Sequence, residues 1–279
     1  MSDIAERRPH LIIRPKARWS LFHLGELWEF RDLLVTFAGR DVRLRYRQTA
    51  LGVIWVVVQP LLAAGILSFV FGSVADLPSE GVPYFVFAYA GTLAWTAFSS
   101  TLTKASGSLV GNAALVSKVF FPRMLLPLSV VGSTLLDFAV ALVVMAVLVV
   151  VGGVTPGVAI VLVPVWLLLV LLLALGVGFL ASSLMVRYRD VQYVLPVAIQ
   201  FALFASPVAY AVDAVPESAR PFFDLNPLVG VLEAFRWSLL DVDAPSAGAL
   251  AYSAIAAVVL FVVGAAWFTR VERQFADVI

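Results

Sequence analysis

The chain has 279 residues, of which 62% are hydrophobic and 13% charged, and its formal net charge is +1. Soluble domains carry roughly 25% charged residues, so this chain has too few to cover a water-facing surface, and lipid is the solvent that suits it. The small net charge gives no indication of a nucleic-acid partner. The absence of cysteine excludes disulfides and cysteine-ligated metals.

The N-terminal segment, MSDIAERRPHLIIRPKARW, lacks the apolar core of a signal peptide, and we expect residues 1–20 to be cytoplasmic and uncleaved. Residues 21–39, LFHLGELWEFRDLLVTFAG, space their apolar side chains near the helical period and place charged ones elsewhere. They are too polar to cross a membrane, so they predict an amphipathic helix lying in the cytoplasmic interface. A soluble helix packed against a partner would show the same pattern.

Six uncharged or nearly uncharged runs follow, each close to the ~20 residues that cross about 30 Å of hydrocarbon. Backbone groups in lipid must be paired within their own segment, so these runs predict helices. GGVTPG at Gly152–Gly157 separates the third run from the fourth as a turn. We therefore predict an all-α, polytopic membrane domain over residues 40–270 and a cytoplasmic tail over 271–279. The predicted spans are 51–72, 81–103, 124–151, 157–186, 191–212 and 244–269.

The distribution of Lys and Arg predicts the orientation of these spans. With six crossings, both ends of the chain share one side of the membrane. All 19 Lys and Arg except Arg220 and Arg236 lie on that side, in the N-terminal segment, the 104–123 and 187–190 loops and the tail. Because cytoplasmic loops are enriched in Lys and Arg, both termini are predicted to be cytoplasmic.

A short apolar segment after the fifth run predicts a structured outer loop. Asn226-Pro227 is a typical helix start, with Asn as the cap and Pro at the first helical position. Leu228–Leu240 then gives a helix of about 20 Å, which is short of a crossing and predicts a re-entrant or interfacial outer helix. Glu233 and Arg236 are three residues apart on it, a spacing that suits pairing with each other or with a neighbour.

Catalytic motifs are missing from the sequence. There is no G-x-x-x-x-G-K-[ST] P-loop, and His10 and His23 precede the first span without a partner. We therefore predict no catalytic residue, metal site or cofactor in this chain. Asp137 is the one charge within a predicted span, as either a proton or ion relay or a hydrogen-bonded packing anchor. A relay normally uses several membrane acids, which favours the anchor.

Polar and aromatic side chains mark some spans as candidates for a pathway. Gln59-Pro60 in the first span and Gln200 with Ser206-Pro207 in the fifth combine amides with kinks. Their amides either face water and sugar hydroxyls or bridge to neighbouring helices. An aromatic cluster within the second span would suit stacking on sugar rings, although most aromatics in such a protein face lipid or pack. The cluster comprises Tyr84, Phe85, Phe87, Tyr89, Trp95 and Phe98.

Four blocks of sequence resemble one family. They are RDVRLRYRQTALGVIWVVVQP at 40–60, SLVGNAALVSKVFFPRMLLPL at 108–128, RYRDVQYVLPVAIQFALFASPVAY at 187–210 and NPLVGVLEAFRWSLL at 226–240. Their order and the six-span layout resemble the ABC-type-2 polysaccharide export permeases, the membrane subunits that export O-antigen, teichoic acid, capsule or similar lipid-linked polymers. The resemblance covers residues 25–270 and leaves about the first 20 outside.

The resemblance implies a homodimer of permease chains in the bacterial inner membrane, joined to two copies of a separate ABC ATPase. ATP and magnesium would be bound by that ATPase, and the substrate would be an undecaprenyl-linked polysaccharide. An ABC exporter of a drug or small lipid has the same fold. A proton-coupled transporter using Asp137 is an alternative of another class. A polytopic glycosyltransferase is weaker, since no pair of acids has a recognisable catalytic spacing.

The resemblance also implies site residues. Arg40, Arg43, Arg45 and Arg47 would meet the pyrophosphate of the lipid, because Arg binds phosphate bidentately, although anchoring at the headgroups explains them equally. A coupling helix in the 104–123 loop would dock into the ATPase near Lys104, Asn112, Lys118 and Arg123. Asn226, Glu233 and Arg236 would belong to an outer gate. A channel between two permeases would be lined by Trp55, Gln59, Pro60, Tyr84, Phe85, Tyr89, Trp95, Gln200, Phe204 and Ser206.

Overall fold

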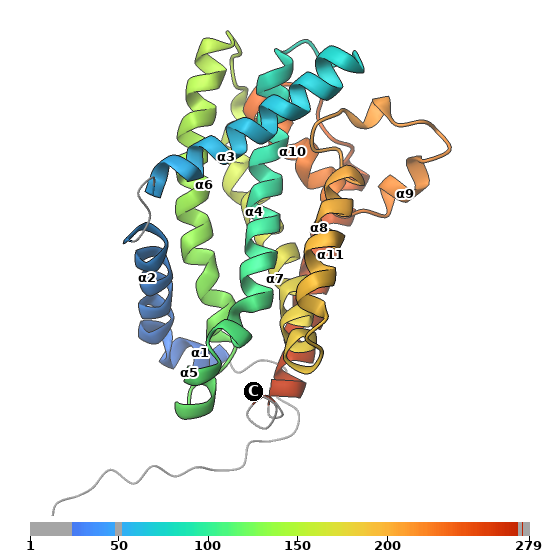
Figure 1. The fold of residues 1–279 in the computed structure, drawn as a ribbon. Helices are drawn as coiled ribbons and strands as arrows, with labels where there is room; N and C mark the ends of the chain where they lie inside the picture. The colour runs from blue at the N-terminus through green and yellow to red at the C-terminus, as the bar shows by residue number, and fades with distance from the viewer. Residues whose placement is uncertain (1–23, 48–51, 273–274, 276–279) are drawn as a thin grey trace, which may run out of the picture.

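A computed structural model describes residues 24–47, 52–272 and 275 of the chain (Figure 1). The predicted segment 1–20 and both histidines lie outside these residues. Every regular element in the described part is a helix. The helices are α1 (Leu24–Glu29), α2 (Arg31–Arg47), α3 (Gly52–Leu67), η1 (Ser68–Val74), α4 (Tyr84–Gly111), α5 (Ala113–Lys118), α6 (Leu125–Val151), η2 (Val158–Leu162), α7 (Val163–Arg187), α8 (Val191–Phe204), η3 (Val212–Ala214), α9 (Arg220–Asp224), α10 (Leu228–Leu240) and α11 (Ala247–Val271).

Four helical stretches within the described residues are long and apolar enough to cross a membrane. They are Ile54–Val74, Leu125–Val151, Val158–Arg187 and Ala247–Val271. They coincide with the predicted first, third, fourth and sixth spans. The chain is therefore an all-helical membrane protein that crosses the bilayer several times.

The other two predicted spans differ from these four. At 28 residues, α4 is about 42 Å long, enough to cross, but its Ser and Thr side chains make it less apolar than the four. Most of α4 is enclosed by other helices, so it does not need a fully apolar surface. Residues 191–212 form a helix only as far as Phe204, and the 14-residue α8 is about 21 Å long.

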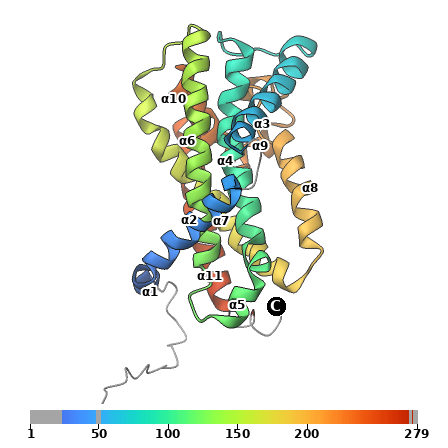
Figure 2. The same cartoon turned by 60° about the vertical axis from the view of Figure 1, so that its left-hand side comes forward.

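The helices pack around α4 and α7, which lie side by side at the centre of the bundle (Figures 1 and 2). The α6 and α3 helices contact α4, and α11 packs along α7. Gly176 of α7 and Gly264 of α11 allow this last pair to approach closely, because a Cβ on either residue would overlap the backbone of the other helix. Helix association in lipid relies on such small residues at the crossing.

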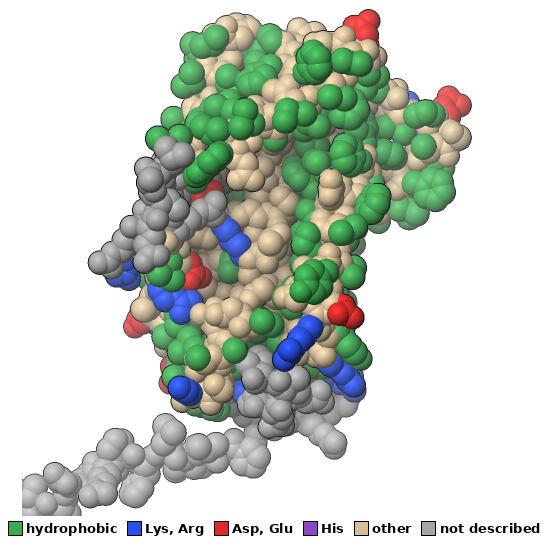
Figure 3. All heavy atoms as spheres, in the orientation of Figure 1, with side chains coloured by type: hydrophobic (Ala, Val, Ile, Leu, Met, Phe, Trp, Pro, Cys, Tyr) green, Lys and Arg blue, Asp and Glu red, His purple; other side chains and the backbone are tan. Residues whose placement is uncertain are grey.

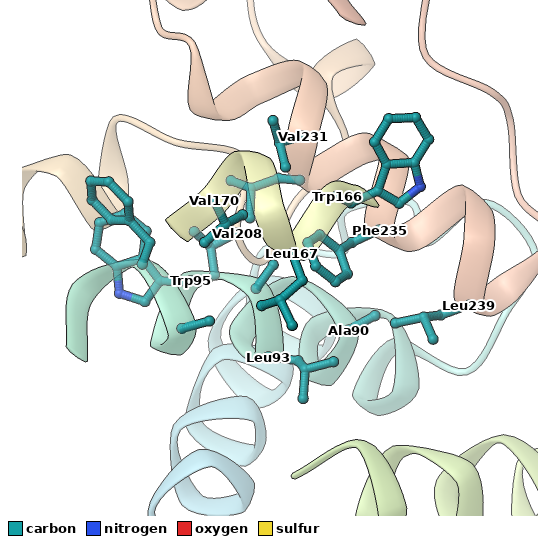
Figure 4. Close-up of a cluster of buried hydrophobic side chains, with 14 of the residues drawn as sticks. Ala90, Leu93, Trp95, Trp166, Leu167, Val170, Val208, Val231, Phe235 and Leu239 are labelled. Carbon is teal, nitrogen blue, oxygen red and sulfur yellow. The ribbon is translucent and has the colours of Figure 1, made fainter. Parts of the chain in front are cut away.

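Two apolar cores lie at opposite ends of the bundle. We name these ends after the short helices found there, the α5 end and the α10 end (Figure 1). At the α10 end, α4, α7 and α10 enclose Trp95, Leu167 and Phe235, among others (Figure 4). At the α5 end, Phe179 packs at a tilt against Phe268, with ring centroids 5.5 Å apart, in a second cluster.

The predicted amphipathic segment 21–39 has a different form in the structure. A short α1 is followed by α2, which continues past Gly39 to Arg47, so the arginine run lies on a helix. This helix packs against α6, where Phe37 is buried and a Cβ on Gly132 would lie 2.8 Å from the Ala38 Cβ. The α2 helix therefore belongs to the bundle along this contact.

Candidate functional site

One face of the bundle carries the polar groups that the sequence marks as a pathway. Both α3 and α8 contact α4 and lie on either side of it (Figure 1). Gln59 on α3 and Gln200 on α8 are exposed, as are Trp55 and Phe204. The space-filling view in the same orientation shows this face hollowed at its centre, where the surface is not hydrophobic (Figure 3).

Hydroxyl side chains of α4 contribute to this polar surface. Thr96, Ser99, Ser100 and Thr103 are at least partly exposed and lie three or four residues apart, which places them on one side of the helix. Thr92, one turn earlier on the same side, is buried and donates to the Ala88 carbonyl over 2.7 Å. The exposed hydroxyls are available to a ligand with many hydroxyl groups, and the sequence analysis missed them. Their helical spacing was the signal that would have revealed them.

The structure separates the predicted lining residues into two sets. Trp55, Gln59, Gln200 and Phe204 are exposed, and Tyr84 and Phe85 are half-buried. The remainder are buried inside one chain, so they do not line this face: Pro60, Tyr89, Trp95 and Ser206. Figure 4 shows Trp95 among core side chains, and the Tyr89 hydroxyl donates to the Ala141 carbonyl over 3.1 Å.

The described arginines of the run on α2 differ in their contacts: Arg40 bonds to another part of the chain, and Arg43 does not. The Arg40 guanidinium lies 3.0 Å from the Asp41 carboxylate and donates to the Asn112 side-chain oxygen over 2.8 Å. The exposed Arg43 contacts its own helix, donating to the Gly39 carbonyl over 3.1 Å. The side chains of Arg45 and Arg47 lie outside the described part. Arg40 therefore fastens α2 to the end of α4, whereas Arg43 is available to an external anion.

A charged pair lies between two central helices. The Lys104 Nζ is 3.1 Å from the Asp137 carboxylate and donates to the Ser133 hydroxyl over 3.1 Å. Lys104 belongs to α4, which corrects the predicted loop: that loop begins at Asn112. The sequence contains a signal for this pair, because Asp137 inside a span requires a partner and Lys104 adjoins an uncharged run. The contact supports the structural interpretation of Asp137.

The segment that connects α4 to α6 presents apolar side chains at the α5 end. Phe121 is buried, with its ring centroid 5.5 Å from that of Phe37. The Arg123 side chain donates to the Glu272 carbonyl, next to the end of α11. Just after α5, however, Val119 is 50% and Phe120 81% exposed. The segment is thus fixed at its second half and presents an apolar tip near Lys118.

The α10 helix has the predicted bounds, and Asn226 caps it by accepting from the Leu228 N–H over 3.0 Å. Arg236 is 2% exposed and donates to the carbonyls of Pro207 and Tyr210, the latter over 3.1 Å. Among the described residues, the direct hydrogen-bond partners of this guanidinium are carbonyls, so the predicted pairing is with a neighbour and not with Glu233.

Acidic groups surround this end of the molecule. Glu80 lies between η1 and α4, and although the residue is exposed in part, desolvation of its carboxyl raises the pKa above its usual value. Arg236 acts against this shift, whereas Asp243 and Asp213 reinforce it. In the described part of the chain, the α10 end thus has acidic groups around the buried cation Arg236.

These features define a multi-pass, all-helical membrane protein with a polar face and no metal-binding cluster of acidic residues or histidines among the described residues. The chain matches the model of the "ABC-2 type transporter" family over residues 32–240, and we conclude that it belongs to this family.

The chain is similar over most of its length to several bacterial permease and transport proteins. The O-antigen export system permease protein RfbA of Klebsiella pneumoniae is 30% identical over 264 residues, which cover 92% of this chain and 98% of the relative. The protein of the same name from Myxococcus xanthus is 30% identical over 254 residues, covering 90% and 97%. The polysialic acid transport protein KpsM of Escherichia coli is 25% identical over 247 residues, covering 85% and 93%.

Proposed function

We propose that this chain is the transmembrane permease subunit of an ATP-driven ABC exporter that moves a lipid-linked polysaccharide across the bacterial inner membrane. The observation that carries the proposal is similarity over almost the whole chain to permeases named for the export of O-antigen. A relative named for polysialic acid transport supports the same substrate class. The exposed hydroxyls of α4 and amides of α3 and α8 are groups that exchange hydrogen bonds with sugars.

The transport route in this proposal lies between two copies of the chain. A helix pair that leaves polar side chains exposed within a bilayer requires water or a partner there, because lipid cannot satisfy them. Gln59 and Gln200 are such groups on α3 and α8. A homodimer that closes over the face of Figure 3 would enclose them in a polar route. Asn226, Glu233 and Arg236 are assigned to its outer gate.

The energy in this proposal comes from a partner. Two copies of an ABC ATPase would bind ATP and magnesium and dock at the α5 end. The exposed apolar tip at Val119 and Phe120, with Lys118 beside it, suits insertion into another protein. Lys and Arg are concentrated toward this end, which favours a cytoplasmic location for it and for both termini.

The lipid-linked end of the substrate is assigned to the exposed arginines of α2. Arg43 is available for a diphosphate, and Arg45 and Arg47 stay in the proposal as members of the same run. Arg40 is assigned instead to the contact between α2 and Asn112, because its guanidinium is already hydrogen-bonded there. In this scheme an undecaprenyl-linked substrate contacts Arg43 and not Arg40.

Two alternatives receive less support. The pairing of Asp137 with Lys104 disfavours a proton-coupled transporter, because the carboxylate is already engaged in a structural ion pair whose two groups lie 3.1 Å apart. Export of a drug or small lipid is compatible with the fold, but the relatives are named for polysaccharide transport.

The decisive experiment is reconstitution of the permease with its ATPase in liposomes. We expect ATP-dependent transfer of an undecaprenyl-linked glycan into the lumen, with copurification of such a glycan from cells. A variant ATPase unable to hydrolyse ATP is the control. Transfer of small amphiphiles without any glycan transfer would favour the drug or lipid exporter.

A further inference from the structure

The chain between α8 and η3 is buried although it is not helical. Within residues 205–211, Ser206 is fully inaccessible and Val208, Ala209 and Ala211 are at most 3% exposed. Buried backbone groups need hydrogen-bond partners. Within the segment, the Val208 N–H donates to the Ser206 carbonyl over 2.7 Å. The carbonyls of Ala205, Pro207, Ala209 and Tyr210 accept instead from side chains elsewhere in the fold.

Three side chains from separate places supply donors to these carbonyls. Arg236 of α10 donates to Pro207 and Tyr210. Tyr84 of α4 donates its hydroxyl to the Ala209 carbonyl over 2.7 Å, and Asn226 donates to the Ala205 carbonyl over 3.0 Å. We refer to Tyr84, Asn226 and Arg236 as the carbonyl clamp. The clamp joins α4 and α10 to the C-terminal end of α8, at Phe204. We call this the outward end of α8.

The fit around the clamp leaves little room for movement. The Arg236 guanidinium lies over the Phe87 ring, 4.1 Å from its centroid, which orients the plane of its donors. Across from it, a Cβ on Gly91 would overlap the Val208 carbonyl oxygen and lie 3.1 Å from an Arg236 nitrogen. Glycine is thus required for the segment to approach α4 this closely.

The α8 helix itself has no comparable anchorage. None of its 14 residues is buried, and its main contacts with other helices are with α4 and α7. The segment that follows it at Phe204 is, by contrast, enclosed on several sides. The location of the outward end of α8 is therefore determined mainly by where the clamp holds residues 205–211.

We infer that the carbonyl clamp positions the outward end of α8, and that Arg236 is a positioning residue for the transport route. In this scheme Arg236 acts on the route through Phe204 and Gln200 and does not touch the polymer. The importance of Arg236 for transport rests on the proposed function, whereas its effect on the location of the end of α8 does not.

The test uses a cysteine at the outward end of α8. Because the chain contains no cysteine, Phe204→Cys provides a single reporter, labelled with a water-soluble maleimide in the assembled complex. Arg236→Gln and Tyr84→Phe each remove donors to the segment. Tyr89→Phe is the matched control, since it removes one buried hydroxyl of the same helix that donates to α6.

We expect Tyr84→Phe to change the labelling rate about fivefold, the factor that corresponds to ~1 kcal/mol for one hydrogen bond, and Arg236→Gln to change it more. Arg236→Lys should fall between wild type and Arg236→Gln, because one ammonium retains part of the donor set. Tyr89→Phe should leave the rate unchanged. Equal rates in Tyr84→Phe and the control would overturn the inference.

A second measurement separates positioning from loss of folding. Complex yield and midpoint of thermal unfolding should be similar for Tyr84→Phe and Tyr89→Phe, since each loses one hydroxyl contact. A labelling change that merely followed the unfolding midpoint across all variants would contradict the inference. Glycan transfer is measured separately in the Phe204→Cys parent, so absence of transfer in this parent together with altered labelling rates in the variants would count against the proposed function alone.

Discussion

The ammonium of Lys104 lies 3.1 Å from the carboxylate of Asp137, within the helical bundle and between α4 and α6. Both side chains are largely enclosed, with 26% and 11% of their surfaces exposed. Each charge offsets part of the desolvation free energy of the other, which would be large for an isolated ion in such surroundings.

Asp137→Asn alone should destabilise the chain by about 2 kcal/mol, less than the ~3–5 of a fully buried pair since Lys104 stays partly exposed. The double variant Lys104→Met/Asp137→Leu should recover most of this loss. The midpoint of thermal unfolding in detergent measures both effects. We expect the double variant to retain export; a stable, ATPase-bound double variant without export would instead support a proton relay.

Arg40 and Arg43 form a matched pair on one helix. Arg40→Ala removes hydrogen bonds to Asp41 and Asn112 and should lower the free energy of unfolding by about 1 kcal/mol. Arg43→Glu should leave stability unchanged and slow export several-fold, because the exposed charge meeting the substrate diphosphate is reversed. Unfolding and glycan transfer, compared in both variants, separate the two roles. Normal export in Arg43→Glu would remove the diphosphate contact.

Apolar runs predicted most of the membrane helices correctly, but they did not predict which helices pack together or which side chains pair between them. The uncharged run before Lys104 suggested that the helix ends there, whereas α4 continues to Gly111. A charge ends a hydropathy run but not a helix, provided that a partner such as Asp137 meets it inside the protein. Only the packing of α4 against α6 brings these residues together.

Residues 191–212 illustrate the opposite limit. The run is uncharged throughout, and the absence of charge alone does not distinguish a spanning helix from a buried irregular segment. The helix ends at Phe204, and the following carbonyls are satisfied by Tyr84 and Arg236, which are distant in sequence. Likewise, the sequence showed that Tyr89 belongs to an aromatic cluster, but it could not show that this side chain is buried against α6.

The tip after α5 gives a test of docking. Phe120→Glu places a charge on a side chain that is 81% exposed, so the fold should tolerate it while the apolar contact with the ATPase is lost. We expect reduced copurification of the ATPase and uncoupled ATP hydrolysis. Phe222→Glu, at a 76% exposed position in α9 at the other end, is the control and should leave ATPase binding intact. Equal ATPase recovery from both variants would exclude the α5 end as the docking site.

The pathway itself is tested by the chemistry of its surface. Gln59→Cys and Gln200→Cys should react with a water-soluble maleimide in the assembled transporter, because both positions face the proposed polar route. Val147 on α6 is 57% exposed in the isolated chain, but its apolar surroundings predict that it faces lipid. Val147→Cys should therefore stay inert to the same reagent, although all three positions are exposed in the single chain. Bound glycan should protect positions 59 and 200, and reactivity at 147 equal to theirs would show that exposure in this fold does not distinguish a water-filled route from lipid.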